Sequence, residues 1–152
     1  MLHKKTKYAL KALFALARRP NVPVHIADLA AAEGIPKKFL ESILAELKNH
    51  GILQSKKGRG GGYQLSRASH RVMLGEVIRM LSGPLAPIPC VSQTRYVRCE
   101  DCPHEELCGV RAVMKEVRDS TARILDHTSL AEVAAQMERI KNKGYESAMY
   151  YI

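Results

Sequence analysis

The sequence predicts a mainly α-helical protein with a single β-hairpin, and three patterns support this fold class. Apolar residues recur every three or four positions through most of the chain, as they do along the buried faces of helices. A short stretch near residue 58 mixes basic residues with glycines, and a later row of apolar residues keeps a heptad spacing. Together these patterns predict a winged helix-turn-helix domain with a two-stranded β wing, followed by a long dimerisation helix and a C-terminal helix.

The helix-turn-helix is predicted between Ile26 and Gly51. The first helix buries Ile26, Leu29 and Ala30, and Gly34 permits the sharp turn that follows. The second helix opens at Pro36, where a missing N–H costs nothing, and it stops before Gly51. Its buried face consists of Leu40, Ile43, Leu44 and Leu47. Two helices joined in this way are typical of domains that bind DNA.

The opposite face of the second helix is polar, and it carries Lys37, Lys38, Glu41, Ser42 and Lys48. In a helix that lies in the major groove, the lysines would contact phosphates. Glu41 and Ser42 would reach base edges, since a carboxylate accepts a hydrogen bond from a cytosine amino group. An ordinary solvated face of an amphipathic helix is the alternative interpretation.

The hairpin follows directly, with predicted strands at 52–55 and 63–65. Its tip carries the DNA-contact candidates Lys56, Lys57, Arg59, Gly60 and Gly61. A flexible basic tip of this size suits a minor groove or a row of phosphates. A nucleotide-binding glycine loop is the rival explanation, but no Gly-Lys-Ser/Thr follows and no helix begins at the glycines.

The distribution of charge agrees with a nucleic-acid partner. The chain of 152 residues has a formal net charge of +9. Residues 1–75 carry 14 Lys and Arg against 4 Asp and Glu, whereas residues 76–152 carry 10 against 11. All of the excess positive charge therefore lies in the half that contains the helix-turn-helix.

Other classes of protein fit poorly. No apolar run approaches the roughly 20 residues that span a bilayer, and no signal-peptide core is present, so we expect a cytoplasmic protein without a membrane partner. No catalytic Ser/His/Asp grouping, carboxylate pair or cofactor fingerprint is evident. We therefore expect no enzymatic activity and no small-molecule substrate.

The remaining helices and boundaries follow from the same periodicity. Thr6 is predicted to cap a buried first helix that runs to about residue 18, and a fourth helix spans Leu74–Leu81. Residues 82–89 hold three prolines and a glycine and cannot be helical. The predicted segments are a DNA-binding domain (1–82), a linker with a cysteine loop (83–108), a dimerisation helix with a C-terminal helix (103–141) and a tail (142–152).

The longest helix is predicted from Pro103 to about His127. Its apolar row consists of Leu107, Val110, Met114, Val117, Thr121 and Ile124. A helix of about 25 residues is about 37 Å long, which is too long for so small a domain to cover. A second copy of the same helix is the natural cover, so we predict a homodimer; packing on its own domain is the alternative. Thr128 or Ser129 is predicted to cap the last helix, which buries Leu130, Val133, Met137 and Ile140.

All four cysteines, Cys90, Cys99, Cys102 and Cys108, fall within 19 residues. Cys102 stands at the predicted start of the long helix, where the amide dipoles favour a thiolate. Three uses remain open on chemical grounds: an iron–sulfur cluster, a closed zinc site, and a thiol–disulfide switch formed most simply by Cys99 and Cys102. His104 is a further candidate ligand, although a surface histidine needs no such role.

Three segments resemble the Rrf2 family of bacterial transcription regulators: Thr6–Leu13, the helix from Ile35 to Leu47, and the wing Gly58–Tyr63. A cysteine loop that leads into a long helix is also similar, and the resemblance covers residues 1 to about 135. It implies a homodimeric winged-helix repressor or activator that binds a pseudo-palindromic double-stranded operator. By position, Lys38, Glu41 and Ser42 match the family's base-contacting helix, and Lys57 and Arg59 match its minor-groove wing.

The resemblance also implies a cofactor. Many members hold a 2Fe–2S or 4Fe–4S cluster through three loop cysteines and one further ligand, and they act as iron–sulfur, nitric oxide or redox sensors. Other members sense cysteine metabolism without a cluster. This chain departs from the family's even cysteine spacing, because only Cys102-x5-Cys108 matches it. The choice of ligands therefore stays open, as does the choice among cluster, zinc and no metal.

These features predict that the state of the cysteine loop sets the angle between the two DNA-binding heads of a dimer, and so the operator affinity. A metal- or cluster-carrying assembly factor, with the basic head binding a protein, is the alternative from another class. That alternative predicts no salt-dependent binding to duplex DNA.

Overall fold

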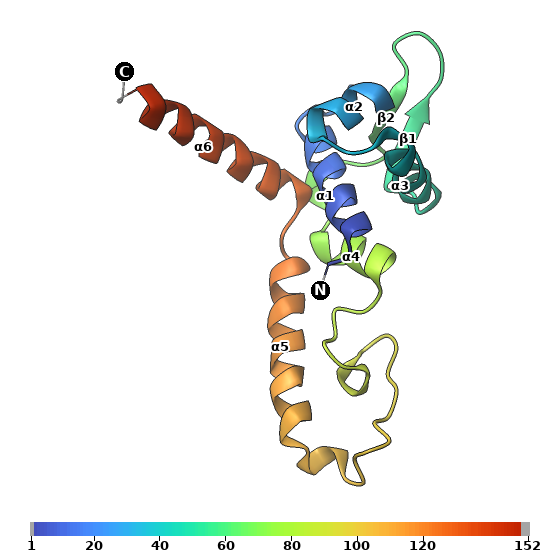
Figure 1. Ribbon diagram of the computed structural model, residues 1–152, viewed down its shortest axis with the longest axis vertical. Helices are drawn as coiled ribbons and strands as arrows, with labels where there is room; N and C mark the ends of the chain where they lie inside the picture. Colours follow the sequence, from blue (N-terminus) through green and yellow to red (C-terminus); the bar gives the residue numbers. More distant parts are fainter. Residues whose placement is uncertain (1, 150–152) are drawn as a thin grey trace. The chain divides into compact units, whose positions relative to one another are not determined.

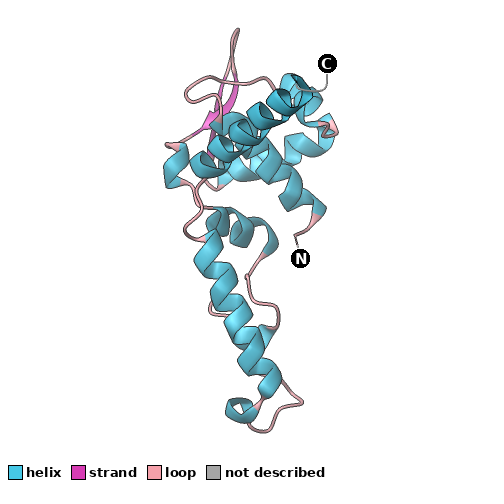
Figure 2. Cartoon of the chain, turned by 90° about the vertical axis from the view of Figure 1, so that its left-hand side faces the viewer, coloured by secondary structure: helices cyan, strands magenta, loops and turns pink. Residues whose placement is uncertain are grey.

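The computed structural model describes the backbone of residues 2–149 and the side chains of residues 2–144. Contacts within the chain define two units. One holds His3–Val72 together with the residues from Ser129 onward, and we call it the winged-helix unit; the other holds Met73–Thr128, and we call it the cysteine unit. Figures 1 and 2 show the helices of both units and the hairpin. Among the described residues, no helix combines the length and hydropathy that crossing a lipid bilayer requires.

The winged-helix unit is built from four helices and a two-stranded sheet. They are α1 (Lys4–Ala17), α2 (Ile26–Glu33), α3 (Lys37–Asn49), β1 (Leu53–Lys56), β2 (Gly62–Leu65) and α6 (Leu130–Met149), with a short 3₁₀ turn, η1 (Ser69–Arg71), after β2. The side chains of Leu13, Leu40, Ile43 and Leu44 are fully buried, so α1 and α3 supply the centre of the core. The first turns of α6 also pack on α1, and Leu130 is fully buried there. These elements confirm the predicted fold class.

The helix-turn-helix has the predicted turn. Gly34 adopts a left-handed conformation with φ of 63°, and the N–H of Ile35 donates to the carbonyl of Ala30 over 3.0 Å. This arrangement ends α2 and satisfies one of its last carbonyl groups. Gly51 closes α3 in the same way, with φ of 75°. Pro36 lies one residue before the first helical residue, Lys37, and so it acts as the N-cap of α3.

The hairpin is tied to the rest of the unit at its base. Strands β1 and β2 are antiparallel, with Leu53 opposite Leu65 and Lys56 opposite Gly62. Val24, just before α2, forms an isolated bridge with Tyr63. A Cβ atom on residue 62 would come within 2.3 Å of the Val24 carbonyl oxygen, so only glycine allows this close approach. The base of the wing is therefore fixed to the start of α2.

The cysteine unit contains α4 (Leu74–Ser82), α5 (Gly109–Leu125) and the chain between them. This chain is irregular, as the prolines predict, apart from two 3₁₀ turns, η2 (Pro89–Val91) and η3 (Glu105–Leu107). Both α4 and η2 pack against α5. The two contact units do not coincide with the predicted segments, because α4 packs on α5 and α6 packs on α1.

The largest differences from the prediction are at three helix ends. Helix α1 begins at Lys4, so Thr6 lies in its first turn, fully buried, and does not act as the cap; His3 occupies that position. Helix α5 begins at Gly109 and not at Pro103, with Cys108 as its N-cap, and its 17 residues are about 25 Å long. The third end is that of α6, which continues past residue 141 to Met149. Residues 150–152 of the predicted tail lie outside the described residues.

Of the two residues predicted to cap the last helix, Thr128 and Ser129, it is Ser129 that forms the cap. Its backbone N–H and hydroxyl donate to Glu132 Oε2 over 2.7 and 2.8 Å, and the Glu132 N–H donates to the Ser129 hydroxyl over 3.2 Å. This reciprocal pattern is a capping box, which satisfies donors that a helix start otherwise leaves free. Further along α6, Ile140 is exposed and does not join the predicted buried face.

Candidate nucleic-acid interface and cysteine loop

The polar face of α3 is open to solvent along its length. All five predicted contact residues on this helix are exposed: Lys37, Lys38, Glu41, Ser42 and Lys48. The opposite face of the helix is fully buried. The Ser42 hydroxyl donates to the Phe39 carbonyl over 2.8 Å, so its proton is used inside the helix and its oxygen remains an acceptor. A base amino group is the donor that this oxygen can accept from.

Two acidic side chains of the same unit take part in ion pairs. Glu46 pairs with Lys5 of α1, and Glu33 lies 3.5 Å from Arg18. Among the described residues, Glu41 has no such partner, so its carboxylate is available on the polar face of α3. One free carboxylate among lysines is the arrangement expected for a base contact surrounded by phosphate contacts.

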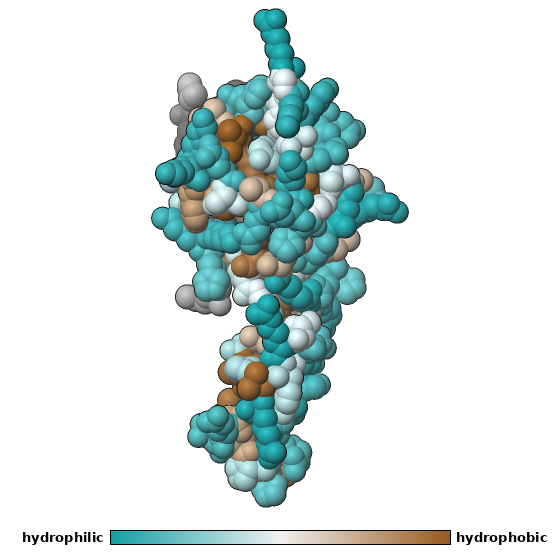
Figure 3. Space-filling view, turned by 90° about the vertical axis from the view of Figure 1, so that its right-hand side faces the viewer, coloured by the Kyte–Doolittle hydropathy of each residue, from teal (hydrophilic) through white to brown (hydrophobic). Residues whose placement is uncertain are grey.

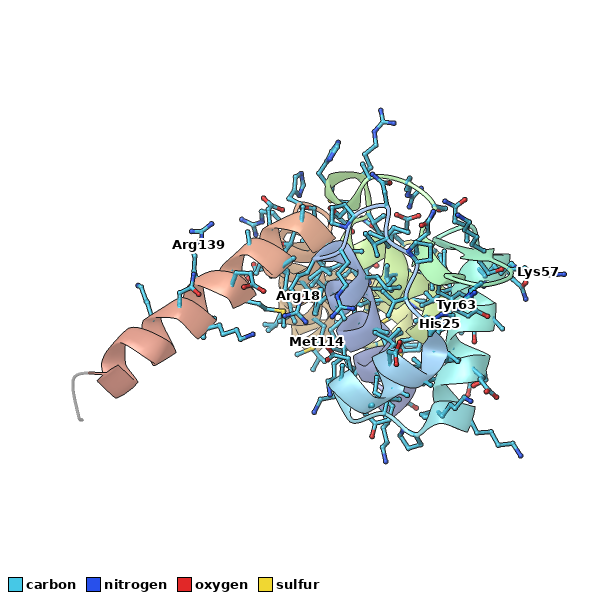
Figure 4. The ribbon with its side chains drawn as sticks, turned by 90° about the horizontal axis from the view of Figure 1, so that it is seen from above. Arg18, His25, Lys57, Tyr63, Met114 and Arg139 are labelled. Atoms are coloured by element: carbon cyan, nitrogen blue, oxygen red, sulfur yellow. The ribbon has the colours of Figure 1, made fainter. Side chains whose placement is uncertain are left out.

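The tip of the hairpin is basic and exposed. Lys56, Lys57, Arg59 and Gly60 are all exposed, and Figure 4 shows Lys57 at the far end of the hairpin, pointing away from the helices. Gly61 differs, because it is buried in the turn, where its N–H donates to the Gly58 carbonyl over 3.0 Å. Its place in the hairpin is therefore to shape the backbone.

An aromatic and basic cluster extends the polar face of α3, and sequence reasoning did not identify it. Phe39 is 36% exposed, and the Tyr8 ring meets it edge-on with 5.8 Å between the ring centroids. The Lys4 ammonium group lies 5.6 Å from the centre of the Tyr8 ring. The sequence signal that could have revealed this cluster is Phe39, an aromatic residue that falls outside the apolar spacing of α3. His25, exposed at the start of α2, lies near Tyr63 at the base of the hairpin (Figure 4).

In the cysteine unit, three of the four thiols come together. The sulfur atoms of Cys102 and Cys108 are 3.7 Å apart, and the Cys102 thiol also interacts with Cys99. The backbone N–H of Cys102 donates to the Cys99 carbonyl over 3.5 Å. Within the described residues, however, no group of three or more His, Cys, Asp or Glu side chains is arranged to hold a metal ion. The loop therefore gathers suitable donors without forming a closed cage.

The two closest thiols have opposite electrostatic environments. The backbone N–H of Arg111, in the first turn of α5, donates to the Cys108 sulfur over 3.4 Å and is the main cause of a lowered pKa of Cys108. Hydrogen bonds with Cys108 and Cys99 raise the pKa of Cys102 to about 12. The sequence predicted that the helix N-terminus would favour a thiolate at Cys102. That prediction was wrong, because α5 starts six residues later and its free N–H groups point at Cys108.

The remaining ligand candidates are Cys90 and His104. Cys90 is buried in η2, which packs against α5. His104 is two-thirds exposed, and its Nδ1 lies 3.7 Å from a Glu106 carboxylate oxygen. Their assignment as ligands stays a prediction.

The loop is held by side chains that sequence reasoning missed. The Tyr96 hydroxyl donates to the Glu105 carboxylate, with oxygen–oxygen distances of 2.8 and 2.9 Å, and this bond raises the pKa of Tyr96. Arg98 donates to the Pro103 carbonyl over 3.4 Å. Arg111 Nε lies 3.9 Å from Glu105 and is the one buried side-chain donor in the described structure without a hydrogen-bond partner. A buried cationic donor in the first turn of α5, whose backbone N–H bonds to the Cys108 sulfur, favours a negatively charged group in the loop.

The predicted dimer row is uncovered in the single chain. Four of its members are exposed large hydrophobic residues: Leu107 (80%), Val110 (64%), Val117 (43%) and Ile124 (65%). Val113, which was not predicted, is also 55% exposed. The other two members, Met114 and Thr121, are half-buried. Leu107 lies in η3, directly before α5.

The comparison with known proteins identifies the family. Residues 2–136 match the Rrf2 model, described as an iron-dependent transcriptional regulator. The chain belongs to the Rrf2 family. An Rrf2-like HTH-type transcriptional regulator of Rhodobacter capsulatus is 41% identical over 139 residues, which cover 89% of this chain and 93% of the relative.

Two solved structures of Rrf2-type regulators have the same fold. CymR (YrzC), the global cysteine regulator of B. subtilis, has a TM-score of 0.75 at 26% identity, covering 90% of this chain and 97% of CymR. IscR of T. potens has a TM-score of 0.73 at 25% identity, covering 92% of this chain and 90% of IscR. The Rrf2 protein is thus a winged-helix, DNA-binding transcriptional regulator, and its relatives are regulators rather than enzymes.

Proposed function

We propose that this Rrf2 protein binds a pseudo-palindromic operator as a homodimer, and that the state of its cysteine loop sets the operator affinity. The observation that carries the proposal is the division of surfaces between the two units. An exposed basic face occupies the winged-helix unit, whereas an exposed apolar row and a cluster of thiols occupy the cysteine unit. A regulator needs these three surfaces: one for DNA, one for a second copy, and one for a signal.

In the proposed DNA complex, α3 lies in the major groove. Lys37, Lys38 and Lys48 contact phosphates and fix the orientation of the helix, while Glu41 and Ser42 contact bases. Both base-contacting groups present acceptor oxygens, which favours cytosine or adenine at the contacted position, because each of these bases offers an amino group in the major groove. Lys57 and Arg59 extend the contact into the adjacent minor groove or along its phosphates.

In the proposed dimer, the apolar row on α5 packs against the same row of a second copy. Exposed side chains of this size are unfavourable in water, and burying them is favourable by about 25 cal/mol per Å². A surface that covers itself in this way is typical of two-fold dimers. The two winged-helix units of such a dimer would face two half-sites of a symmetric operator, about one helical turn apart.

The cysteine loop suits a metal group in its chemistry. Cys99, Cys102 and Cys108 are soft sulfur donors, and the Arg111 side chain, whose Nε has no hydrogen-bond partner among the described residues, would stabilise a negatively charged group. These three cysteines would hold an iron–sulfur cluster or a zinc ion, with the fourth ligand from His104, Cys90 or another source. When bound, a cluster would supply sensitivity to iron and to oxidants.

The side chains of the loop connect this site to α5. Cys108 caps the helix through the Arg111 N–H, so a change at its sulfur alters the first turn of α5 directly. The Tyr96–Glu105 hydrogen bond holds the upstream part of the loop against the turn that precedes the helix. A loop fixed by its ligands would hold α5 in one orientation, and a free loop would release it.

The 3.7 Å distance between Cys102 and Cys108 also favours a thiol switch as a second candidate. Hydrogen peroxide could oxidise this pair: one S–S bond forms, the two thiol protons leave, and the peroxide is reduced to two water molecules. The sequence favoured Cys99 with Cys102 for this role, whereas the distance in the structure supports Cys102 with Cys108. Mass spectrometry after peroxide treatment tests this switch. If Cys102 and Cys108 remain thiols, the switch is contradicted.

Operator affinity of two preparations tests the proposal. Anaerobically reconstituted protein and chelated, reduced protein are titrated with a fluorescent operator duplex, identified by selection from random sequence. We expect their affinities to differ by about 5- to 150-fold, which is the usual range of coupling between two sites. Equal affinities would contradict the switch, and the absence of salt-dependent duplex binding would contradict DNA recognition and favour a role in metal or cluster assembly.

A further inference from the structure

The end of α5 that lies opposite the cysteine loop carries an ion pair with fixed geometry. Asp126, the C-cap of α5, accepts two hydrogen bonds from Arg79 of α4, with nitrogen–oxygen distances of 2.6 and 2.7 Å. Each carboxylate oxygen bonds to a different guanidinium nitrogen, so the pair is bidentate. A bidentate pair fixes the angle between two groups as well as their separation.

The Asp126 carboxylate also lies directly against the backbone of α4. A Cβ atom on residue 75 would come within 1.9 Å of Asp126 Oδ1 and 3.0 Å of the Arg79 guanidinium. Alanine would therefore displace the carboxylate, although it is a better helix former than glycine. The hydrogen bonds from Arg79 hold the pKa of Asp126 below its ordinary value, which agrees with a stable charged pair. Gly75, Arg79 and Asp126 thus form one three-residue clamp.

The clamp lies next to the points at which the chain passes between the two units. These points are Val72–Met73 and Thr128–Ser129, so Gly75 and Asp126 are each two residues away from one of them. Inside the cysteine unit, the N–H of Leu74 donates to the Thr128 carbonyl over 2.9 Å. The start of α4 and the exit from α5 are therefore joined by the clamp and by one backbone hydrogen bond.

From this arrangement we infer that Gly75, Arg79 and Asp126 are positioning residues that transmit the state of the cysteine loop to the winged-helix unit. The inference rests on the proposed function, because it needs a loop whose state changes operator affinity. Cys108 caps one end of α5 and Asp126 caps the other, and 17 helical residues lie between them. A helix of this length moves as a stiff rod, so a tilt set at the loop reaches the clamp, which passes it to both connecting segments.

Four variants separate transmission from mere support. Asp126→Asn removes the negative charge and one acceptor oxygen. Arg79→Lys keeps the positive charge but cannot form two parallel hydrogen bonds. Gly75→Ala displaces the carboxylate without changing any charged group. The control is Arg123→Gln, which removes a positive charge from the last turn of the same helix, where the Arg123 side chain donates to the Ser120 hydroxyl. For each variant we compare the operator affinities of the reconstituted and chelated forms, the thermal midpoint, and amide hydrogen exchange at Leu74.

In the wild-type protein and in Arg123→Gln, we expect the two forms to differ by about 5- to 150-fold. In Asp126→Asn, Arg79→Lys and Gly75→Ala, the ratio should fall below about twofold, while the absorption spectrum of the loaded loop is unchanged. The exchange rate at Leu74 should depend on loop state in the wild type and not in these variants. A clamp that only supports the fold would lower the thermal midpoint and leave the affinity ratio intact, and that result would overturn the inference.

A double variant gives a second, independent criterion. Once Asp126→Ala has removed the carboxylate, Gly75→Ala has no carboxylate left to displace, and the Arg79 side chain is no longer held near residue 75. The affinity ratio of the double variant should therefore equal that of Asp126→Ala alone. A further loss in the double variant would show that Gly75 acts by another route and would overturn the three-residue clamp. A wild-type ratio of one would instead contradict the proposed switch itself, so the two failures are distinguishable.

Discussion

Individual side chains on the winged-helix unit offer different chemistry to a DNA duplex. Lys57 is an exposed point charge at the tip of the hairpin. Glu41, by contrast, is an exposed carboxylate on α3. A point charge contributes to binding at every sequence, because phosphates are the same everywhere. A carboxylate discriminates, since it accepts a hydrogen bond from some bases and is repelled by others.

Replacing Lys57 with Ala should therefore weaken binding to all duplexes about equally. The slope of the logarithm of affinity against the logarithm of salt concentration should become shallower by about 0.9, because one phosphate contact is lost. Arg139→Ala is the matched control: it removes one exposed positive charge from α6 of the same unit (Figure 4) and should leave the slope unchanged. Fluorescence anisotropy over a range of salt concentrations measures both.

Replacing Glu41 with Ala should instead relax base preference at one operator position. The loss of discrimination should be about 1–3 kcal/mol at that position, with little change in salt dependence. Binding to a library of operators randomised at each position measures the effect. Unchanged preference would show that Glu41 does not contact a base.

At the residue scale, the sequence predicts the exposure of a side chain where the helical spacing of the buried residues decides it. The polar face of α3 follows from the positions of four buried residues on the opposite side. The approach of Cys102 to Cys108 does not follow from a five-residue spacing, because an irregular loop can place its ends at many distances. The Tyr96–Glu105 bond and the Tyr8–Phe39 contact depend on tertiary packing and leave no periodic signal.

Among the secondary-structure elements, the capping box of α6 has a consequence for pH. Bonds from the backbone and hydroxyl of Ser129 lower the pKa of Glu132. The charged form therefore stabilises the folded protein fully above the ordinary pKa of an unfolded Glu, about 4.3. This contribution is lost as the pH falls through the lower pKa of the folded state.

Glu132→Gln should accordingly lower the thermal midpoint at neutral pH, and the difference from the wild type should shrink as the pH falls below about 4. Circular dichroism melting curves from pH 7 to pH 3 measure this difference. Glu116→Gln, which neutralises an exposed carboxylate on α5, is the control. A gap between wild type and Glu132→Gln that stays constant with pH would show that the box does not depend on the charge.

The C-terminal end of a helix was predictable where a glycine follows it. The N-terminal start of a helix was harder to predict. Gly34 and Gly51 mark ends that only a left-handed residue allows. The start of α5 was missed because Pro103 is a strong signal for a first helical residue, whereas cysteine is an unusual N-cap. Leu107 matches the heptad spacing in the sequence, but it lies in the η3 turn, which precedes the helix.

At the scale of the whole molecule, the apolar surface of the cysteine unit is the feature that most needs a partner. Figure 3 shows brown, hydrophobic atoms on the surface in the lower part of the view. The exposed apolar residues of α5 belong to this unit, as do Tyr96 (52%) and Val97 (61%) of the linker. Exposed apolar residues gathered in this number are typical of an interface.

Val117→Glu should convert a dimer into monomers, because a two-fold interface would bury the new charge twice. The cost should be roughly 3 kcal/mol or more, or over 100-fold in the dimer dissociation constant. Sedimentation velocity measures the assembly, and the affinity for a full operator should fall towards that for a half-site. Ala112→Glu places the same charge at another exposed position on α5 and should leave the dimer intact.

The concentration of positive charge in residues 1–75 also affects how such a regulator finds its target. A strongly cationic head associates with any stretch of chromosome and slides along it, so the protein spends little time free in the cell. Arrival at the operator is then fast in every state of the protein, and a signal can act only on the time the protein stays there. The switch should therefore appear in single-molecule records as a change in residence time, with the rate of arrival unaltered.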